Sequence, residues 1–141
     1  MDTHKVLTSW KGKMQFESDN PSGDRIYMDA GPENGGEGNG LRPKAMMLSS
    51  LAGCTGLDVV SLMVKMKLQA DEFTIDVEGD LTEEHPKTYH TVRVAYHFHG
   101  NNLDEAKLEK AVNLSVDKYC GVMEMFRQFA KVETKIYYHH S

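Results

Sequence analysis

The stretch of sequence that decides the fold is PKAMMLSSLAGCTGLDVVSLMVKMK, residues 43–67. It opens with a proline, which suits the first position of a helix because no hydrogen bond is needed from that nitrogen. Apolar residues then occupy nearly every face, which predicts a long helix buried at the centre of the molecule. The small residues Ser49, Ala52, Gly53 and Gly56 fall three or four positions apart. We therefore expect another element to approach this helix closely.

The segments on either side of this helix are predicted to be rich in β-strand. Alternating apolar and polar residues, bounded by glycine- and proline-containing turns, are typical of half-buried strands. The expected strands cover residues 6–10, 14–17, 25–29, 73–78, 92–99 and 132–138. The first three form a small meander, and the next two form an antiparallel hairpin. Between the first three strands and the long helix, the glycine-rich acidic segment 31–40 is expected to be a flexible loop.

Two further helices are expected between the hairpin and the last strand. Asn102 followed by Glu105 is a variant of the capping box, which opens the first of them. A break near Asp117 opens the second, whose apolar stripe includes Met123. The element order predicts an α+β fold, with antiparallel sheets around the long buried helix and a single domain over residues 1–141.

Composition excludes several classes of protein. The chain has 141 residues, of which 16 are Lys or Arg and 21 are Asp or Glu, giving a net charge of −5. This balance argues against a nucleic-acid or anionic-membrane partner. The N-terminus is charged and lacks the apolar core of a signal peptide. Asp58 interrupts the longest apolar segment, 46–64, so we expect no membrane span and a cytoplasmic protein.

Histidines are numerous, but their spacing does not favour a metal site. His97 and His99 share the outer face of an expected strand, where alternating histidines are most simply solvent-facing. His139 and His140 stand at the C-terminus, where we expect a frayed end. No Ser/His/Asp triad can be built, because the candidate serines sit in the long helix without an elbow motif. No metal and no bound cofactor are therefore expected.

The two cysteines, Cys54 and Cys120, carry the sharper chemical signal. They are too few for a disulfide-stapled domain or a thiolate zinc site. Cys54 lies within the long helix. With Asp117 as N-cap, Cys120 would occupy the third position of a helix, where free N–H groups and the helix dipole favour a thiolate. The alternative, in which both cysteines are small buried hydrophobic residues, stays open.

Two segments resemble the OsmC/Ohr family. Residues 43–60 are similar to the family's long-helix signature, and residues 116–122 are similar to its second-cysteine segment. The resemblance implies an intertwined homodimer with the long helices at its centre and two active sites at the subunit interface. It also implies thiol-dependent reduction of organic hydroperoxides. Cys54 would be the peroxidatic cysteine and Cys120 the resolving cysteine, and an external dithiol would be the reductant.

The resemblance is incomplete around Cys54. The family's active peroxidases carry an acidic residue nine or ten positions before the first cysteine, where this chain has Ala45 and Lys44. They also use an arginine from the N-terminal strands, for which Arg25 and Arg42 are the nearest candidates. These departures keep an alternative open: a non-catalytic or redox-sensing dimer that binds a small apolar ligand at its interface pocket.

Overall fold

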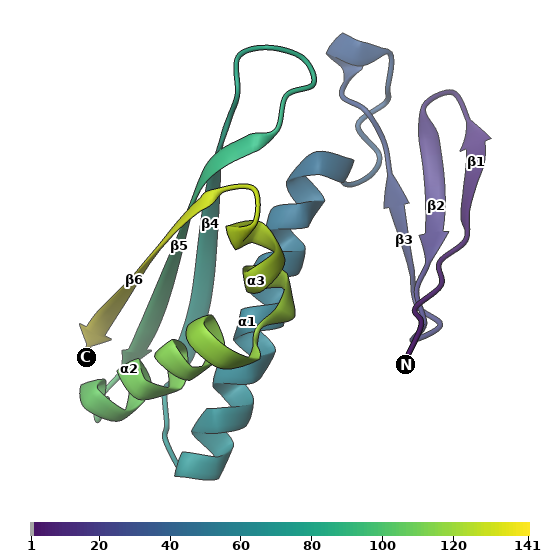
Figure 1. Cartoon of the computed structure of the whole chain (residues 1–141). Coiled ribbons are helices and arrows are strands. Elements are labelled where there is room, and N and C mark those ends of the chain that lie inside the picture. The colour runs from purple at the N-terminus through teal and green to yellow at the C-terminus, as the bar shows by residue number, and fades with distance from the viewer. Residues whose placement is uncertain (1) are drawn as a thin grey trace. The chain divides into compact units, whose positions relative to one another are not determined.

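The computed structural model describes residues 2–141, which divide into two compact units, 2–47 and 48–141 (Figure 1). The elements run β1 (Thr8–Gly12), β2 (Gln15–Asp19), β3 (Arg25–Met28), the 3-10 turn η1 (Pro32–Asn34), α1 (Pro43–Met66), β4 (Glu72–Leu81), β5 (Tyr89–Gly100), α2 (Glu105–Leu114), the π-helical turn η2 (Ser115–Tyr119), α3 (Gly121–Arg127) and β6 (Lys131–His140). This order confirms the expected α+β fold. The expected single domain over residues 1–141 stays a prediction, because each unit is described by itself.

The first unit is a three-stranded antiparallel meander in the order β1-β2-β3. Phe16 of β2 lies opposite Trp10 of β1 and Met28 of β3. Within residues 2–47, however, no hydrophobic side chain is buried. Its exposed large hydrophobic residues are Val6, Leu7, Trp10, Met14, Phe16, Tyr27, Leu41 and Met47. This sheet therefore lacks a hydrophobic core of its own.

The glycine-rich segment after β3 is built around one buried carboxylate rather than being an open flexible loop. Asp29, only 3% exposed, accepts backbone N–H bonds from Ala30 (2.8 Å), Glu37 (3.3 Å) and Asn39 (3.1 Å). These bonds hold the pKa of the Asp29 carboxyl below its ordinary value, because they stabilise the ionised form,. The expectation of a flexible loop missed this anchor, which precedes the glycines in sequence.

The second unit contains a mixed sheet in the order β4-β5-β6 (Figure 1). β4 and β5 form the predicted antiparallel hairpin, in which Ile75 lies opposite Tyr96. β6 runs parallel to β5, which corrects the expectation of purely antiparallel sheets. The physical reason is the connection: α2, η2 and α3 form a crossover long enough to bring the chain back in the same direction.

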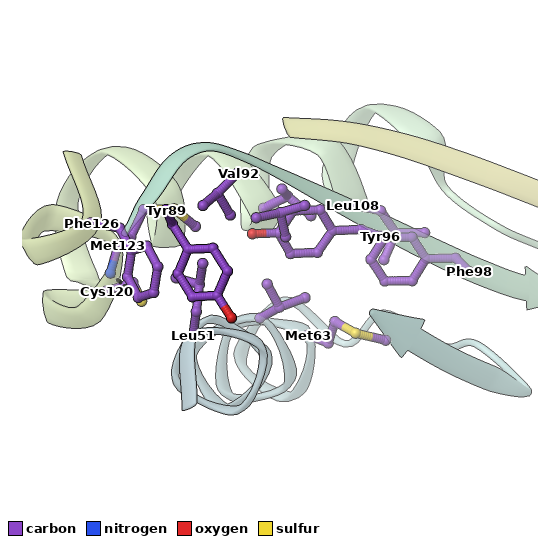
Figure 2. Close-up of a cluster of buried hydrophobic side chains, with 13 residues drawn as sticks. Leu51, Met63, Tyr89, Val92, Tyr96, Phe98, Leu108, Cys120, Met123 and Phe126 are labelled. Carbon is purple, nitrogen blue, oxygen red and sulfur yellow. Dashed lines mark hydrogen bonds between the residues drawn. The ribbon is translucent and has the colours of Figure 1, made fainter. Parts of the chain in front are cut away.

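The hydrophobic core of the second unit lies between this sheet and its helices (Figure 2). The inward residues of β5 are those that the alternating pattern predicts, namely Val92, Val94, Tyr96 and Phe98. Each large side chain fully removed from water contributes about 1.5–3 kcal/mol to folding. Gly56 permits the expected close approach to the sheet, since a Cβ there would stand 3.2 Å from Ile75 Cδ1.

α1 spans the predicted residues but is not buried on all sides in a single chain. Only one stripe, with one residue per turn, is buried: Leu51, Thr55, Val59 and Met63. Leu57 and Val64 are 76% and 73% exposed. Among the described helices, α1 alone has the length and mean hydropathy, 1.6 over 18 residues, to cross a membrane, a test that core helices of soluble proteins also meet.

Three local expectations are corrected in the second half of the chain. Asp104, not Asn102, caps α2, because its carboxylate accepts the Lys107 N–H at 3.2 Å. The break before α3 lies at Cys120 rather than near Asp117, which falls inside η2. The C-terminal histidines are not frayed: β6 extends to His140, whose Nε2 lies 2.6 Å from a Glu105 carboxylate oxygen.

Candidate active site

The second unit brings the two predicted site residues, Cys54 and Cys120, into contact. Cys54 lies in the middle of α1 and is half-buried, whereas Cys120 lies at the start of α3 and is 3% exposed. Cys54 packs against the buried cluster that contains Cys120 and lies near enough to raise the pKa of its thiol, and both are free thiols. Residues 66 positions apart in sequence thus form one dithiol site.

Cys120 is the N-cap of α3 rather than its third residue. Its backbone is extended (φ −79°, ψ 105°), and its sulfur accepts the backbone N–H of Met123 at 3.3 Å. The Cys120 N–H itself donates to the carbonyl of Ser115 at 2.9 Å, five residues earlier, which closes the π-helical turn. The sulfur therefore takes the place of the usual capping oxygen.

The environment of Cys120 favours a thiol, which reverses the expectation of a thiolate at this position. Burial raises the pKa of the Cys120 thiol to about 11, and the contact with Cys54 and the negative charge of Asp58 act in the same direction. The Met123 N–H opposes them, but one hydrogen bond does not outweigh the loss of water around a charged sulfur,. Cys120 is thus held protonated at neutral pH.

A chain of buried hydroxyl groups lies beside the cysteines, and the sequence pattern had not identified it. Thr55 Oγ1 lies 2.8 Å from the Tyr96 hydroxyl and 2.7 Å from Ser115 Oγ. Ser115 Oγ in turn donates to Asp58 Oδ2 at 3.0 Å. A signal for it existed: Thr55 stands at a polar position of the otherwise apolar buried stripe of α1, and Tyr96 on the inward face of β5.

This hydroxyl chain has a defined direction. The single proton of the Ser115 hydroxyl is directed at Asp58 Oδ2 at 3.0 Å or at the Thr55 carbonyl at 3.4 Å, so the Ser115 oxygen must accept from the Thr55 hydroxyl,. Thr55 then accepts from the Tyr96 phenol. Burial raises the pKa of Tyr96 to about 12, so the phenol keeps its proton and remains a donor. The bonds therefore run from Tyr96 through Thr55 and Ser115 to Asp58.

The basic residues considered for the site have other partners. Arg25 donates to the Glu17 carboxylate at 2.6 Å, and this ion pair lowers the pKa of Glu17. Arg42 donates to the backbone carbonyls of Asp29 (3.5 Å) and Gly40 (3.2 Å). In the second unit, Arg127 donates to Glu124 at 3.0 Å and to the Val116 carbonyl, so it ties α3 to the π-helical turn.

The first turn of α1 holds the two residues that replace the family's acid. Lys44 and Ala45 are both exposed, and no acidic residue occurs in that turn. Any activation of the Cys54 thiol must therefore use groups other than a carboxylate at these two positions.

The histidines on the outer face of the β4-β5-β6 sheet interact with one another. His97 bonds Asp76 through Nε2 at 2.9 Å and His139 through Nδ1 at 3.1 Å. His99 stacks on His139 with ring centroids 4.3 Å apart. Within residues 2–141, no group of three His, Cys, Asp or Glu side chains is arranged to hold a metal ion.

The first unit contains a hollow of about 540 Å³. Its apolar lining comes mainly from Met14, Phe16, Met28 and Pro43, and its charged lining residues are Asp29, Glu33 and Arg42. The apolar part of this lining suits a small apolar ligand.

Comparison with known proteins identifies relatives along nearly the whole chain. A family model described as OsmC-like protein matches residues 36–135. Protein YhfA of Escherichia coli K12 is 28% identical over 128 residues, which cover 91% of this chain and 92% of that protein.

Solved structures agree with this result. A hypothetical protein from Aquifex aeolicus VF5 has a TM-score of 0.80 and 28% identity, with 98% of both chains covered. The organic hydroperoxide resistance protein OhrB of Bacillus subtilis has a TM-score of 0.65 and 16% identity, covering 96% of this chain and 98% of that one. At this lower identity the likeness shows the fold alone.

Proposed function

The chain belongs to the OsmC-like protein family, and from that membership we propose that it reduces organic hydroperoxides with Cys54 and Cys120. The observation that carries the proposal is the contact between these two free thiols in the second unit. Further support comes from the fold shared with a protein named for organic hydroperoxide resistance. The expected cytoplasmic location is part of this proposal, because cytoplasmic thiols are kept reduced.

The first step takes place at Cys54, the more accessible of the two sulfurs. Its thiolate attacks one peroxide oxygen and the O–O bond breaks. The sulfur becomes a sulfenic acid and the other fragment leaves as an alcohol after taking up a proton. Two electrons pass from sulfur to peroxide in this step. The apolar side chains that pack near Cys54 favour a substrate with an organic group over hydrogen peroxide.

The second step uses Cys120. Its sulfur attacks the sulfenic sulfur of Cys54, the S–O bond breaks, and the leaving hydroxide combines with the thiol proton to give water. The raised pKa of Cys120 keeps it a thiol, and so less open to direct oxidation, until the sulfenic acid has formed,. An external dithiol then restores both thiols by exchange and is itself oxidised to a disulfide.

We also propose that the working molecule is a homodimer. The first unit exposes a row of large hydrophobic residues and has no buried core among its described residues. α1 exposes Leu57, Val60 and Val64 on the faces outside its buried stripe. Exposed apolar area of this extent is typical of an interface, and a second copy of the chain supplies equivalent surfaces.

The direct test is peroxide consumption by the purified protein with a dithiol. Wild type is expected to reduce cumene or tert-butyl hydroperoxide faster than hydrogen peroxide. Cys54→Ser should abolish consumption. Cys120→Ser should allow a sulfenic acid to accumulate at Cys54, detectable by dimedone labelling and mass spectrometry. A wild-type rate equal to that of Cys54→Ser with all three peroxides would refute the proposal.

A second candidate function is a dimer that binds a small apolar ligand without catalysis. It is favoured by the hollow of about 540 Å³ with its apolar lining, and by Ala45 and Lys44 at the positions of the family's acid. Native mass spectrometry of the protein as isolated would detect such a ligand. A ligand that Met28→Arg displaces, together with a Cys54 that alkylates no faster than an unperturbed thiol, would support this function over the peroxidase.

A further inference from the structure

The hydroxyl chain beside the cysteines connects the two segments that carry them. Thr55 directly follows Cys54 in α1, and Ser115 begins the π-helical turn that ends before Cys120. Their side-chain oxygens are 2.7 Å apart and fully buried. This bond is therefore a direct link between the α1 turn at Cys54 and the turn leading to Cys120.

Ser115 acts on Cys120 through its backbone as well. Its carbonyl accepts the Cys120 N–H at 2.9 Å, while its hydroxyl contacts Thr55 and Asp58 of α1. One residue thus holds the Cys120 backbone on one side and α1 on the other. π-helical turns are rare and occur frequently at functional sites, so the geometry here is a specific one.

The acceptors available to Ser115 limit how the two central hydroxyls are oriented. Its hydroxyl donates to Asp58 Oδ2 at 3.0 Å, with the Thr55 carbonyl as a second acceptor at 3.4 Å, and both acceptors belong to α1. The Ser115 oxygen therefore accepts from Thr55, which in turn accepts from the Tyr96 phenol,. Buried and fully satisfied networks of this kind make one geometry more favourable than its neighbours. The network therefore holds the Cys120 backbone, through the Ser115 carbonyl, in a fixed position relative to the α1 turn that carries Cys54.

We propose that Ser115 and Thr55 are positioning residues for disulfide formation, with Tyr96 and Asp58 orienting their hydroxyls. The inference rests on the proposed function for its biological meaning, but its physical content concerns only how fast the two sulfurs join. None of the four residues exchanges electrons. They hold the π-helical turn against α1, so that Cys120 can attack the sulfenic sulfur of Cys54 without a prior conformational change of the backbone.

The kinetic test measures disulfide formation in the reduced full-length protein. The oxidants are a hydroperoxide and, separately, the diazene diamide, which takes up two thiol hydrogens and becomes a hydrazine. We expect Thr55→Val and Ser115→Ala to slow closure of the disulfide at least 10-fold. The rate of sulfenic acid formation at Cys54 with a hydroperoxide should stay within 2-fold of wild type. Thr55→Ser, which keeps the hydroxyl, should restore the rate.

If Thr55→Val or Ser115→Ala fails to fold, variants that disturb the core less can still test the proposal. Tyr96→Phe removes one oxygen from the network, and Tyr89→Phe is its matched control on the same strand, outside the hydroxyl chain. We expect Tyr96→Phe to slow disulfide closure about 3-fold and Tyr89→Phe to leave it unchanged. Circular dichroism and thermal unfolding establish that each variant is folded.

A pH profile separates positioning from a general loss of stability. The titratable and charged groups near the pair are Cys54 and Asp58 of α1, Tyr96 of β5 and Arg127 of α3. Asp58→Asn keeps an oxygen that accepts from Ser115 but removes the charge that favours the Cys120 thiol. We expect the pH midpoint of disulfide closure to fall, while Thr55→Val leaves that midpoint in place.

The proposal is overturned if folded Thr55→Val and Ser115→Ala close the disulfide at the wild-type rate. It is equally overturned if Tyr96→Phe matches Tyr89→Phe and Asp58→Asn does not move the pH midpoint. Failure of the proposed function would give a different result. The hydroperoxide would leave wild-type Cys54 reduced, whereas the rates of disulfide closure with diamide would still differ between wild type and the variants as predicted.

Discussion

Cys120 is the residue whose chemistry the structure changes most. At the sequence level, a cysteine near a helix start predicts a thiolate, because N–H groups stabilise negative charge. In the folded chain its sulfur does accept the Met123 N–H, yet burial dominates and raises its pKa to about 11. These properties suit the resolving role proposed for Cys120 and differ from those of an activated nucleophile.

The raised pKa of Cys120 can be measured directly. In Cys54→Ala, the contact with the neighbouring thiol is lost but burial remains. The pKa of Cys120 should therefore fall below 11 and stay above its ordinary value of 9. Thiolate absorbance at 240 nm, followed from pH 7 to pH 12, gives the value. A pKa below 8.5 in this variant would mean that burial is not the main cause.

His139 gives a second prediction at the residue scale. Partial desolvation and the neighbouring His99 and His97 lower its pKa below 6.5. The unfolded chain then binds more protons than the folded chain between that lowered value and pH 6.5, so the free energy of unfolding decreases as the pH falls through this range. Below this range the difference is constant, and above it the effect disappears.

Urea unfolding between pH 5 and pH 8 tests this dependence. His139→Gln should flatten it, whereas His4→Gln, a change in the exposed N-terminal segment, should leave the slope unchanged. The carboxyls with lowered pKa values, Glu17, Asp29 and Asp80, lose their stabilising effect at lower pH, below about 4.5. The two windows are therefore separate. If the pH dependence of the free energy of unfolding is the same in His139→Gln as in wild type, a group other than His139 causes it.

At the scale of elements, the loop between β3 and α1 is stabilised by close packing of its own backbone. Asp29 gathers three N–H groups of this loop, and Gly36 brings the chain against the carbonyl of Ala30. A Cβ at Gly36 would stand 1.9 Å from that carbonyl oxygen, far inside any real contact. The conformation of this loop thus depends on one acidic residue, Asp29, and one glycine, Gly36.

Gly36→Ala should therefore destabilise the first unit. We expect a loss of about 2–3 kcal/mol in the free energy of unfolding, because the backbone must move to admit the methyl group. Gly121→Ala is the matched control, since a Cβ there meets no atom within 4 Å. Chemical denaturation of both variants provides the comparison, and equal stability of the two would contradict the tight packing of this loop.

Periodic elements were predictable from sequence, whereas caps and long-range polar contacts were not. The inward set Val92, Val94, Tyr96 and Phe98 follows from alternation alone, and α1 begins at the predicted proline. Asn102 and Asp104 both suit a helix cap, and only the three-dimensional path of the chain selects Asp104. The parallel direction of β6 likewise depends on a crossover that no local pattern records.

The candidate site was predictable as a pair of residues but not as an environment. Cys54 and Cys120 could be named because reactive cysteines are few and their motifs resemble a known family. Their hydroxyl network could not, because Thr55, Tyr96 and Ser115 come from three elements and none is unusual in its own segment. Contacts between residues 41 and 60 positions apart leave no periodic signal.

At the scale of the whole molecule, the proposed homodimer accounts for the exposed faces. Leu57→Glu would place a carboxylate on the exposed apolar face of α1. We expect it to raise the dimer dissociation constant roughly 100-fold or more, because burying an unpaired charge costs at least about 3 kcal/mol. Thr74→Glu, on the exposed polar face of β4, is the control.

Light scattering after size-exclusion chromatography reads the outcome for wild type and both variants. Wild type and Thr74→Glu should elute as dimers, and Leu57→Glu as a monomer or as unfolded material. A monomeric wild type, or a Leu57→Glu dimer of unchanged affinity, would remove α1 from the proposed interface.

The parallel pairing of β6 has a consequence for how the chain is made. Thr91 of β5 lies opposite Lys131 of β6. The last strand can therefore join the sheet only after α2, η2 and α3 between them have been synthesised,. Both thiols leave the ribosome before the last strand does. During synthesis they are exposed without the completed core behind them. Synthesis in the cytoplasm, the location proposed above, would keep both thiols of the nascent chain reduced until the core has formed.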